Sequence, residues 1–182
     1  MRLKSIIKHM IVHKTFDDLE NMEQFWSLYR NCLDGKKGLT RYRLKRYGEF
    51  YGCSIPCAPN IEKFCTPHML YGIFISQGAK IGTGCTIYHG VTIGSNTLAQ
   101  SKGVGAPTIG RNCFIGAGAM IIGNCKIGDN VRIGANCIVT ENVPDNATVV
   151  SPKPIYILHD EPRDNTFLMW DEFIGATLDN RE

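Results

Sequence analysis

The feature that most constrains this chain is an aliphatic residue that recurs at every sixth position in two runs, residues 75–93 and 109–139. Such internal repeats define an architecture more strongly than local propensities do. A single strand alternates with period two and a helix with period 3.6, so a period of six indicates a short strand and a turn, repeated in one orientation. Three such steps make one coil. The sequence therefore predicts an all-β, parallel β-helix with these side chains in its core: Ile75, Ile81, Ile87, Ile93, Ile109, Ile115, Ile121, Ile127, Ile133 and Val139.

Small residues and glycines accompany the repeat at fixed offsets. Glycine follows many of the aliphatic residues, as at Gly82 and Gly110, where a corner needs backbone angles that other residues resist. The position two before the aliphatic residue is small or β-branched. Four of the eight cysteines occupy this position, which predicts a buried structural role for their thiols: Cys85, Cys113, Cys125 and Cys137.

Composition excludes several classes of protein. The net charge of +3 gives no basis for binding nucleic acid. The start of the chain has no long apolar run of the kind a secretory leader needs, so we expect reduced thiols and a cytoplasmic location. Cys53, Cys57 and Cys65 lack the paired spacing of a zinc ribbon, so we expect no metal. No apolar stretch is long enough to span a bilayer.

The segment before the repeat, residues 1–50, is predicted to be helical. Thr15 and Asp18 precede the first helix as a capping pair, Gly35 ends it, and a second helix is expected over residues 39–50. Residues 36–46 carry six basic residues and no acidic one, which indicates either a solvated face or a contact with an anionic lipid headgroup or phosphorylated carrier at the inner face of the membrane. The apolar residues of the first helix recur at steps of three and four: Phe16, Leu19, Met22, Trp26, Tyr29 and Leu33.

A loop is expected to leave the coils at residues 95–107. Ile93 and Ile109 are sixteen residues apart, which exceeds two repeats by four, and the residues between them are polar and without period. Loops that interrupt a rigid repeat are more often functional than accidental. The β-helix is predicted to cover residues 51–157 and to be followed by an acidic tail, 158–182, that is either a docked helix or a disordered end.

The stretches Ile87-Tyr-His-Gly-Val-Thr-Ile-Gly94 and Pro107-Thr-Ile-Gly-Arg-Asn-Cys-Phe-Ile-Gly-Ala-Gly-Ala119 resemble the hexapeptide-repeat acetyltransferases of the serine O-acetyltransferase type. Within that group the chain is most similar to the short O-acetyltransferases of colanic acid and capsule biosynthesis. The resemblance covers residues 50–157. It implies a left-handed β-helix, a homotrimer, and acetyl-CoA bound in a groove between neighbouring coils.

The resemblance also implies the residues of the site. The general base of the family maps to His68, and His89 is histidine in the similar polysaccharide enzymes. Imidazole suits this role because it titrates near working pH, so it can take the proton of an attacking hydroxyl and release it to the departing thiolate. The cofactor-binding residues implied by the resemblance are Ser95, Ala117, Arg132 and Ala135, with Lys102 as a further phosphate ligand.

Departures from the serine enzymes bear on the acceptor. Those enzymes carry an Arg-His pair at the end of the loop, where this chain has Gly105-Ala106, and an aspartate before the catalytic histidine, where it has Pro67. The first hypothesis is therefore O-acetylation of a sugar in surface polysaccharide biosynthesis. The alternatives are serine O-acetyltransferase and a non-catalytic trimeric scaffold. A γ-carbonic anhydrase needs three zinc-binding histidines, and the repeat region supplies two, which argues against that class of enzyme.

Overall fold

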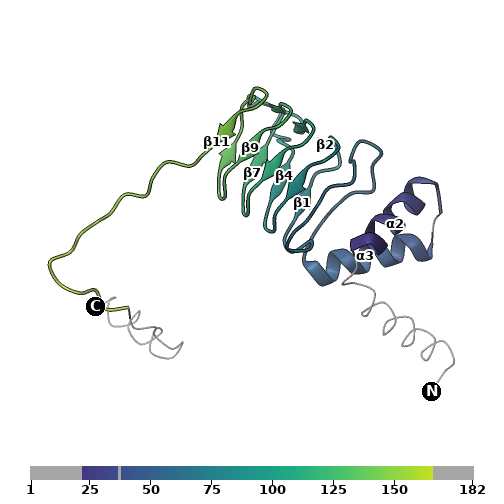
Figure 1. The fold of residues 1–182 in the computed structure, drawn as a ribbon, viewed down its shortest axis with the longest axis horizontal. Helices are drawn as coiled ribbons and strands as arrows, with labels where there is room; N and C mark the ends of the chain where they lie inside the picture. Colours follow the sequence, from purple (N-terminus) through teal and green to yellow (C-terminus); the bar gives the residue numbers. More distant parts are fainter. Residues whose placement is uncertain (1–21, 37, 166–182) are drawn as a thin grey trace, which may run out of the picture. The chain divides into compact units, whose positions relative to one another are not determined.

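The computed structural model describes residues 22–36 and 38–165. Two helices come first, α2 (Met22–Leu33) and α3 (Leu39–Tyr51), and short strands follow (Figure 1). The strands are β1 (Phe74–Ile75), β2 (Lys80–Ile81), β3 (Thr86–Ile87), β4 (Thr92–Gly94), β5 (Thr108–Ile109), β6 (Phe114–Ile115), β7 (Met120–Ile122), β8 (Lys126–Ile127), β9 (Arg132–Ile133), β10 (Ile138–Val139) and β11 (Thr148–Val149).

The strands form three parallel sheets that wind around one core. Their orders are β1-β4-β7-β10, β2-β5-β8 and β3-β6-β9-β11, so that each of the strands β1 to β7 pairs with the third strand after it, and β9 pairs with β11. Ile75 lies opposite Ile93, and Ile109 opposite Ile127, which places the repeat in register at eighteen residues per coil. The predicted left-handed parallel β-helix is confirmed. Figure 1 shows the coils as a stack.

The core is a column of the repeat's aliphatic side chains. All ten are at most 5% exposed, and most are completely buried. Burial of one isoleucine is worth about 1.5–3 kcal/mol, so the column is the main source of stability. The four cysteines two positions before an aliphatic residue are buried as predicted, and burial raises the pKa of the Cys125 thiol. These thiols fill space in the core and are not presented to solvent.

Asparagines form a ladder at the corner between the β2 and β3 sheets. Asn112, Asn130 and Asn146 have φ of 54°, 58° and 61°, in the left-handed region that asparagine tolerates better than most residues. The Asn112 side-chain amide donates to Asn130 Oδ1 at 3.4 Å, and the Asn130 amide donates to Asn146 Oδ1 at 3.1 Å. The side chains therefore link successive coils where the backbone turns.

The loop at residues 95–107 is a ten-residue insertion at one corner. Thr92 pairs with Met120, twenty-eight residues later, whereas Met120 pairs with Ile138, eighteen later. The step of sixteen residues from Ile93 to Ile109 is thus one six-residue repeat plus the ten inserted residues. Asn96 and Gly105 close the loop with two backbone hydrogen bonds of 2.8 and 2.9 Å. The insertion leaves and rejoins the stack without disturbing its register.

The two helices pack against the start of the β-helix. The Tyr29 hydroxyl donates to the carbonyl of Pro56 or Ala58 at 2.9 and 3.0 Å, and burial raises the pKa of this tyrosine to about 12. Trp26 meets Phe64 edge-on at 4.9 Å. Gly35, with φ of 80°, follows α2 as predicted. The expected capping pair Thr15 and Asp18 lies outside the described residues. The helices cover the first coil with aromatic side chains.

The chain separates into two units after Ser151. Residues 152–165 contain no helix or strand and are exposed throughout. The choice between a docked helix and a disordered end for residues 158–182 falls largely outside the described part, and the division into segments 1–50, 51–157 and 158–182 remains a prediction. Neither of the described helices is long and apolar enough to cross a membrane.

Replacing Asn130 by alanine should lower the free energy of unfolding by about 1–2 kcal/mol, because alanine in the left-handed region is strained and the ladder loses its central amide. Asn130→Gly is the matched control, since glycine accepts the same φ at little steric cost. We expect a smaller loss for glycine, measured by urea denaturation. Equal losses for the two variants would show that the backbone angle is not what asparagine provides.

Candidate active site

His68 and His89 lie at one corner of the β-helix, on successive coils. Cys65 forms a parallel bridge with Thr86, and the two histidines follow these residues at the same offset of three. Their ring centroids are 5.2 Å apart with an interplanar angle of 85°. Both side chains are exposed. The structure thus brings the two predicted site histidines into contact, with both rings open to a ligand.

A local insertion in the first coil places His68 there. Cys65 pairs with Thr86, twenty-one residues later, but Phe74 pairs with Thr92, eighteen later, so three additional residues enter this corner. Backbone hydrogen bonds from Met69 to Thr66 and from Ile73 to Leu70 turn the segment. The Leu70 side chain is completely buried and anchors it. The extra residues carry His68 outward while the rest of the corner stays in the stack.

The neighbours of the histidines are aromatic. Tyr88 lies 5.3 Å from His68 between ring centroids, and Phe114 lies 5.1 Å from Tyr88. Within residues 22–36 and 38–165, neither histidine ring makes a hydrogen bond or an ion pair. No carboxylate of the described residues therefore orients either imidazole. The ring nitrogens are available to a substrate hydroxyl.

Two of the predicted cofactor-binding residues continue the histidine corner. Phe114 pairs with Thr86, and Arg132 with Phe114, so Ala117 and Ala135 follow His89 on the next two coils. The amide of Gly118 donates to the His89 carbonyl at 3.0 Å, and the amide of Asn136 to the Ala117 carbonyl at 2.9 Å. Arg132 is exposed on β9, beside this corner. The three residues thus extend from the histidines along the stack.

The other two predicted residues belong to the loop corner. Ser95 lines a cavity of about 640 Å³, and Lys102 is exposed on the loop, where its carbonyl accepts a hydrogen bond from Asn96 at 3.1 Å. A single chain therefore does not bring Ser95 and Lys102 to the histidines. The residues that line this cavity are Gly78, Lys80, Ser95, Asn96, Thr97, Val104, Gly105, Ala106, Thr108 and Asn124.

Tyr88 and Phe114 were not among the predicted site residues. The sequence does indicate where their side chains point. Each residue is adjacent to a buried isoleucine of the repeat, and such neighbours point outward. Phe114 is 40% exposed. A large aromatic residue in an outward position, close to a histidine in the register, is the pattern that would have indicated them.

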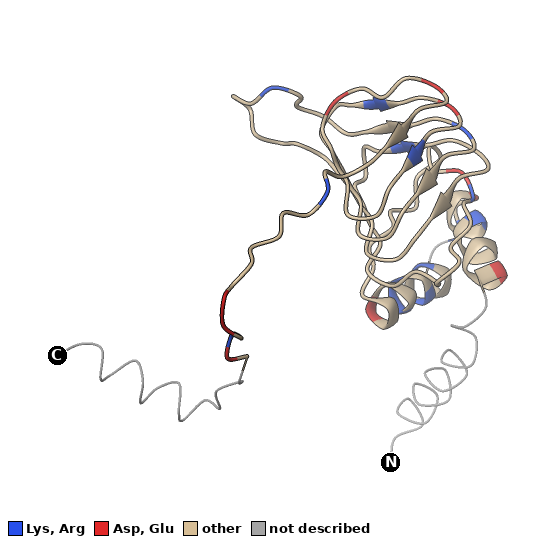
Figure 2. Ribbon diagram, turned by 60° about the vertical axis from the view of Figure 1, so that its left-hand side comes forward, with Lys and Arg blue, Asp and Glu red and all other residues tan. Residues whose placement is uncertain are grey.

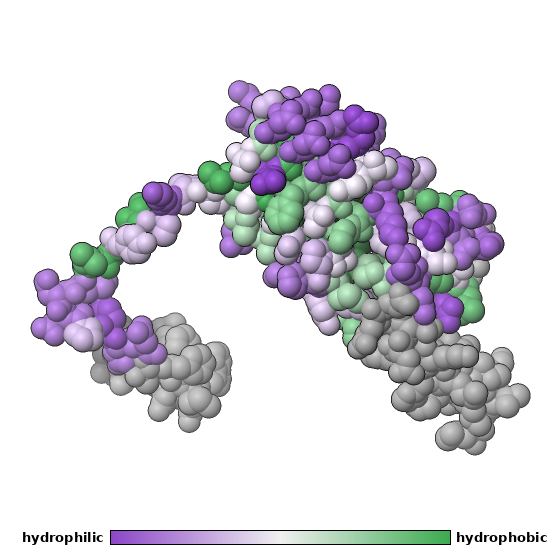
Figure 3. Space-filling view, viewed as in Figure 1, coloured by the Kyte–Doolittle hydropathy of each residue, from purple (hydrophilic) through white to green (hydrophobic). Residues whose placement is uncertain are grey.

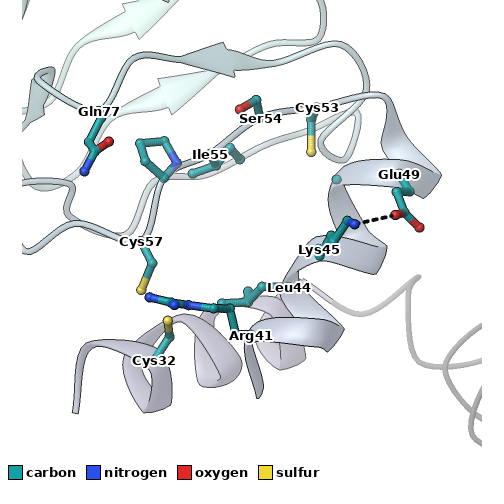
Figure 4. A pocket seen from close by; sticks show the side chains of 12 residues that line it. Cys32, Arg41, Leu44, Lys45, Glu49, Cys53, Ser54, Ile55, Cys57 and Gln77 are labelled. Carbon is teal, nitrogen blue, oxygen red and sulfur yellow. Dashed lines mark ion pairs between the residues drawn. The ribbon is translucent and has the colours of Figure 1, made fainter. Parts of the chain in front are cut away.

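A second cavity, of about 650 Å³, contains thiols and lies between α3 and the start of the first coil (Figure 4). Cys32 and Cys57 point toward one another there, and Arg41 lies beside them. Burial raises the pKa of Cys53 to about 11; burial and a hydrogen bond with Cys32 raise that of Cys57 to about 12. The Cys53 and Cys57 thiols are therefore neutral at pH 7. No group of three or more His, Cys, Asp or Glu residues within the described part is arranged to hold a metal.

Comparisons with known proteins show which family the chain resembles. The bacterial transferase hexapeptide family (six repeats) matches residues 106–141. A serine acetyltransferase of Staphylococcus epidermidis is 33% identical over 98% of this chain and 71% of its own length. The putative colanic acid biosynthesis acetyltransferase WcaB of Escherichia coli is 38% identical over 57% of this chain and 62% of its own length. Several curated serine acetyltransferases are matched over only about half of their length.

A solved structure gives the same result. Serine acetyltransferase isoform 3 of Entamoeba histolytica, in complex with cysteine, superposes with a TM-score of 0.60 and 32% identity over 75% of this chain and 48% of that protein. The three-sided coil and its repeat are those of the hexapeptide transferases. The chain belongs to the hexapeptide-repeat acetyltransferases, in the family that contains the serine acetyltransferases and WcaB.

One buried hydroxyl beside the site allows a test of its packing. Thr66, two residues before His68, is 9% exposed, and its Oγ1 has no hydrogen-bond partner. Because an unpaired buried hydroxyl costs free energy, Thr66→Val should raise the free energy of unfolding by about 1 kcal/mol. Thr66→Ser keeps the hydroxyl and removes the methyl group, so it should lower stability. Thermal denaturation of the two variants measures the difference, and a destabilised valine variant would mean that the hydroxyl is in fact paired.

Proposed function

We propose that this protein transfers an acetyl group from acetyl-CoA to a hydroxyl group, and that a histidine of the His68–His89 pair acts as the general base. The observation that carries this proposal is the contact between the two exposed imidazoles, whose ring centroids are 5.2 Å apart, at a corner where neither ring makes a hydrogen bond within the described chain. Two adjacent bases that are open to solvent suit proton abstraction from a bound acceptor.

The chemistry follows from what an alcohol needs to attack a thioester. The hydroxyl oxygen forms a bond to the acetyl carbonyl carbon as an imidazole nitrogen takes the hydroxyl proton, and the carbon–sulfur bond breaks in the same exchange. The imidazolium then returns the proton to the departing thiolate. Imidazole can do both because its ordinary pKa lies close to neutral pH.

Acetyl-CoA fits the corner that continues from the histidines. Ala117 and Ala135 carry only a methyl group, so an extended pantetheine arm can lie against the backbone there. Arg132 is exposed beside them and can meet phosphate oxygens. Ser95 and Lys102 are proposed to complete this site from a second subunit, since they lie at the loop corner of their own chain.

A homotrimer is proposed as the assembly that would supply this second subunit. The outward residues of the sheet β1-β4-β7-β10 are uncharged, and three of them are exposed hydrophobic side chains: Phe74 at 49%, Met120 at 44% and Ile138 at 71%. Figure 3 shows hydrophobic side chains gathered over the stacked strands. A face of this kind favours association with another copy.

The proposed acceptor is a sugar hydroxyl of surface polysaccharide biosynthesis. Free serine carries an ammonium and a carboxylate that call for charged partners, and the loop ends in Gly105-Ala106 instead of an Arg-His pair. The similarity to WcaB supports this choice. The similarity to serine acetyltransferases keeps serine as the alternative acceptor. A non-catalytic scaffold would leave the histidine pair without a role.

Contact with an anionic membrane surface is a further part of the proposal. Charged residues are sparse over the strands and more frequent on the two helices (Figure 2). Arg41 and Lys45 are exposed on α3. Although Lys45 pairs with Glu49 at 3.7 Å, exposed pairs of this kind are weak and leave the basic face able to meet lipid phosphates. A cytoplasmic enzyme that acts on lipid-linked sugars would profit from this position.

The acceptor class is tested by thiol release from acetyl-CoA. The purified protein is incubated with serine in one reaction and with sugars, nucleotide sugars and glycan fragments in others. We expect release that depends on a glycan acceptor. Turnover with serine alone would show that Gly105-Ala106 can replace the Arg-His pair and would refute the sugar assignment.

Alanine at His68 or His89 should lower kcat by about 10²- to 10⁴-fold, the usual contribution of general acid–base catalysis. The histidine whose removal costs more is the principal base. His159→Ala is the control, because His159 lies in the second unit, where its ring contacts Arg163 at 3.2 Å. Unchanged turnover in the double alanine variant would refute the assignment of the general base to this pair.

A further inference from the structure

An aromatic edge continues outward from the histidine pair. His89, His68, Tyr88 and Phe114 form a chain of ring contacts with centroid separations of 5.2, 5.3 and 5.1 Å. Two of these contacts are tilted, at 53° and 54°, so Tyr88 does not cover either neighbour face to face. Aromatic rings that stay partly open in this way provide a rigid apolar surface beside the reacting groups.

The exposure of Phe114 has no explanation in the core. Its neighbours in the strand register are Thr86 above and Arg132 below, and its ring is 40% exposed. The buried residue of β6 is Ile115, so the phenyl ring is not needed to fill the column. Within the described chain the Phe114 ring contacts one other aromatic ring, that of Tyr88. The position would accept a polar residue as far as folding is concerned.

We propose that Tyr88 and Phe114 form the acceptor subsite, on which the C–H face of a pyranose ring packs while one of its hydroxyls reaches His68 or His89. The inference rests on the proposed function and narrows its acceptor to a ring with an apolar face. The faces of an aromatic ring are electron-rich, and sugar C–H groups are weakly positive, so the two surfaces attract each other. The hydroxyls on the ring edge remain free to reach the bases.

The position of the edge favours the acceptor over acetyl-CoA. Tyr88 contacts His68 itself, whereas Ala117 and Ala135 follow His89 along the corner on the next two coils and have no ring contact with His68. An acceptor must place its hydroxyl at the histidines, and a sugar ring bound there would overlie the adjacent aromatic side chain. Serine has no apolar face of this size, so the edge would contribute nothing to its binding.

The first test measures sugar binding directly. Saturation-transfer NMR is recorded on the full chain with methyl pyranosides and UDP-sugars as probes. We expect transfer to the C–H protons of one ring face in the unaltered protein and in Phe114→Tyr, which keeps the ring. Phe114→Leu should weaken the signal by about three- to tenfold, the range typical of a single aromatic contact. Tyr42→Leu, at an exposed aromatic residue of α3, is the control and should not change it.

The second test separates acceptor from donor in the kinetics. Phe114→Leu should raise KM for the glycan acceptor by about three- to tenfold and leave KM for acetyl-CoA unchanged. A rise in KM for acetyl-CoA alone would assign the edge to the donor and overturn the inference. Absence of saturation transfer to every sugar would overturn it as well. Sugar binding that depends on Phe114, without acetyl transfer, would uphold the subsite and refute the proposed reaction.

Discussion

The stacking of aliphatic side chains at a fixed eighteen-residue interval is the constraint on which the rest of the structure depends. Each strand contributes only two or three residues, too few to form a stable element alone. Its inward isoleucine gains its burial from the coils above and below, and its backbone groups find partners on the same coils. The strands must therefore pair in register for the core to form, and the core forms only when they do. A residue may be added only where the chain turns, because an addition within a strand would rotate its side chains out of the column.

This requirement explains where the candidate site lies. The number of residues per coil exceeds eighteen because of insertions at two corners in particular. One insertion adds three residues before Phe74, and the other adds ten between β4 and β5. The first insertion carries His68, and the second carries Ser95 and Lys102. The strands remain uniform while the corners vary. Functional side chains can thus be placed without altering the packing that supports them, as in other folds whose loops sit on a rigid frame.

The fold could be predicted from the sequence because its period is strict and its inward residues are of one kind. The buried cysteines were predictable for the same reason, since Cys113 and Cys125 occupy a fixed offset from an isoleucine. The size of the loop insertion was less accessible, because the sequence shows only a gap and not which strands pair across it. Tyr88 and Phe114 were missed because outward positions tolerate any residue, so an aromatic side chain there has no periodic signal. The proximity of the histidines is predictable from their spacing of twenty-one residues, which is close to one coil, although the turn at Met69 that lifts His68 is not.

The aromatic cover at the start of the β-helix has a consequence for how motion is distributed along it. In a stack where each coil contacts only its neighbours, opening begins at the ends and spreads inward. The first end is closed by Trp26, Tyr29 and Phe64, all of which are at most 3% exposed, whereas Val149 at the last strand is only half-buried. Fraying should therefore start at β11 and reach the first coils last. The histidine corner lies in the coils beside the closed end, where thermal opening of the backbone is rarest. The two histidines can therefore keep their spacing while the last coils open and close.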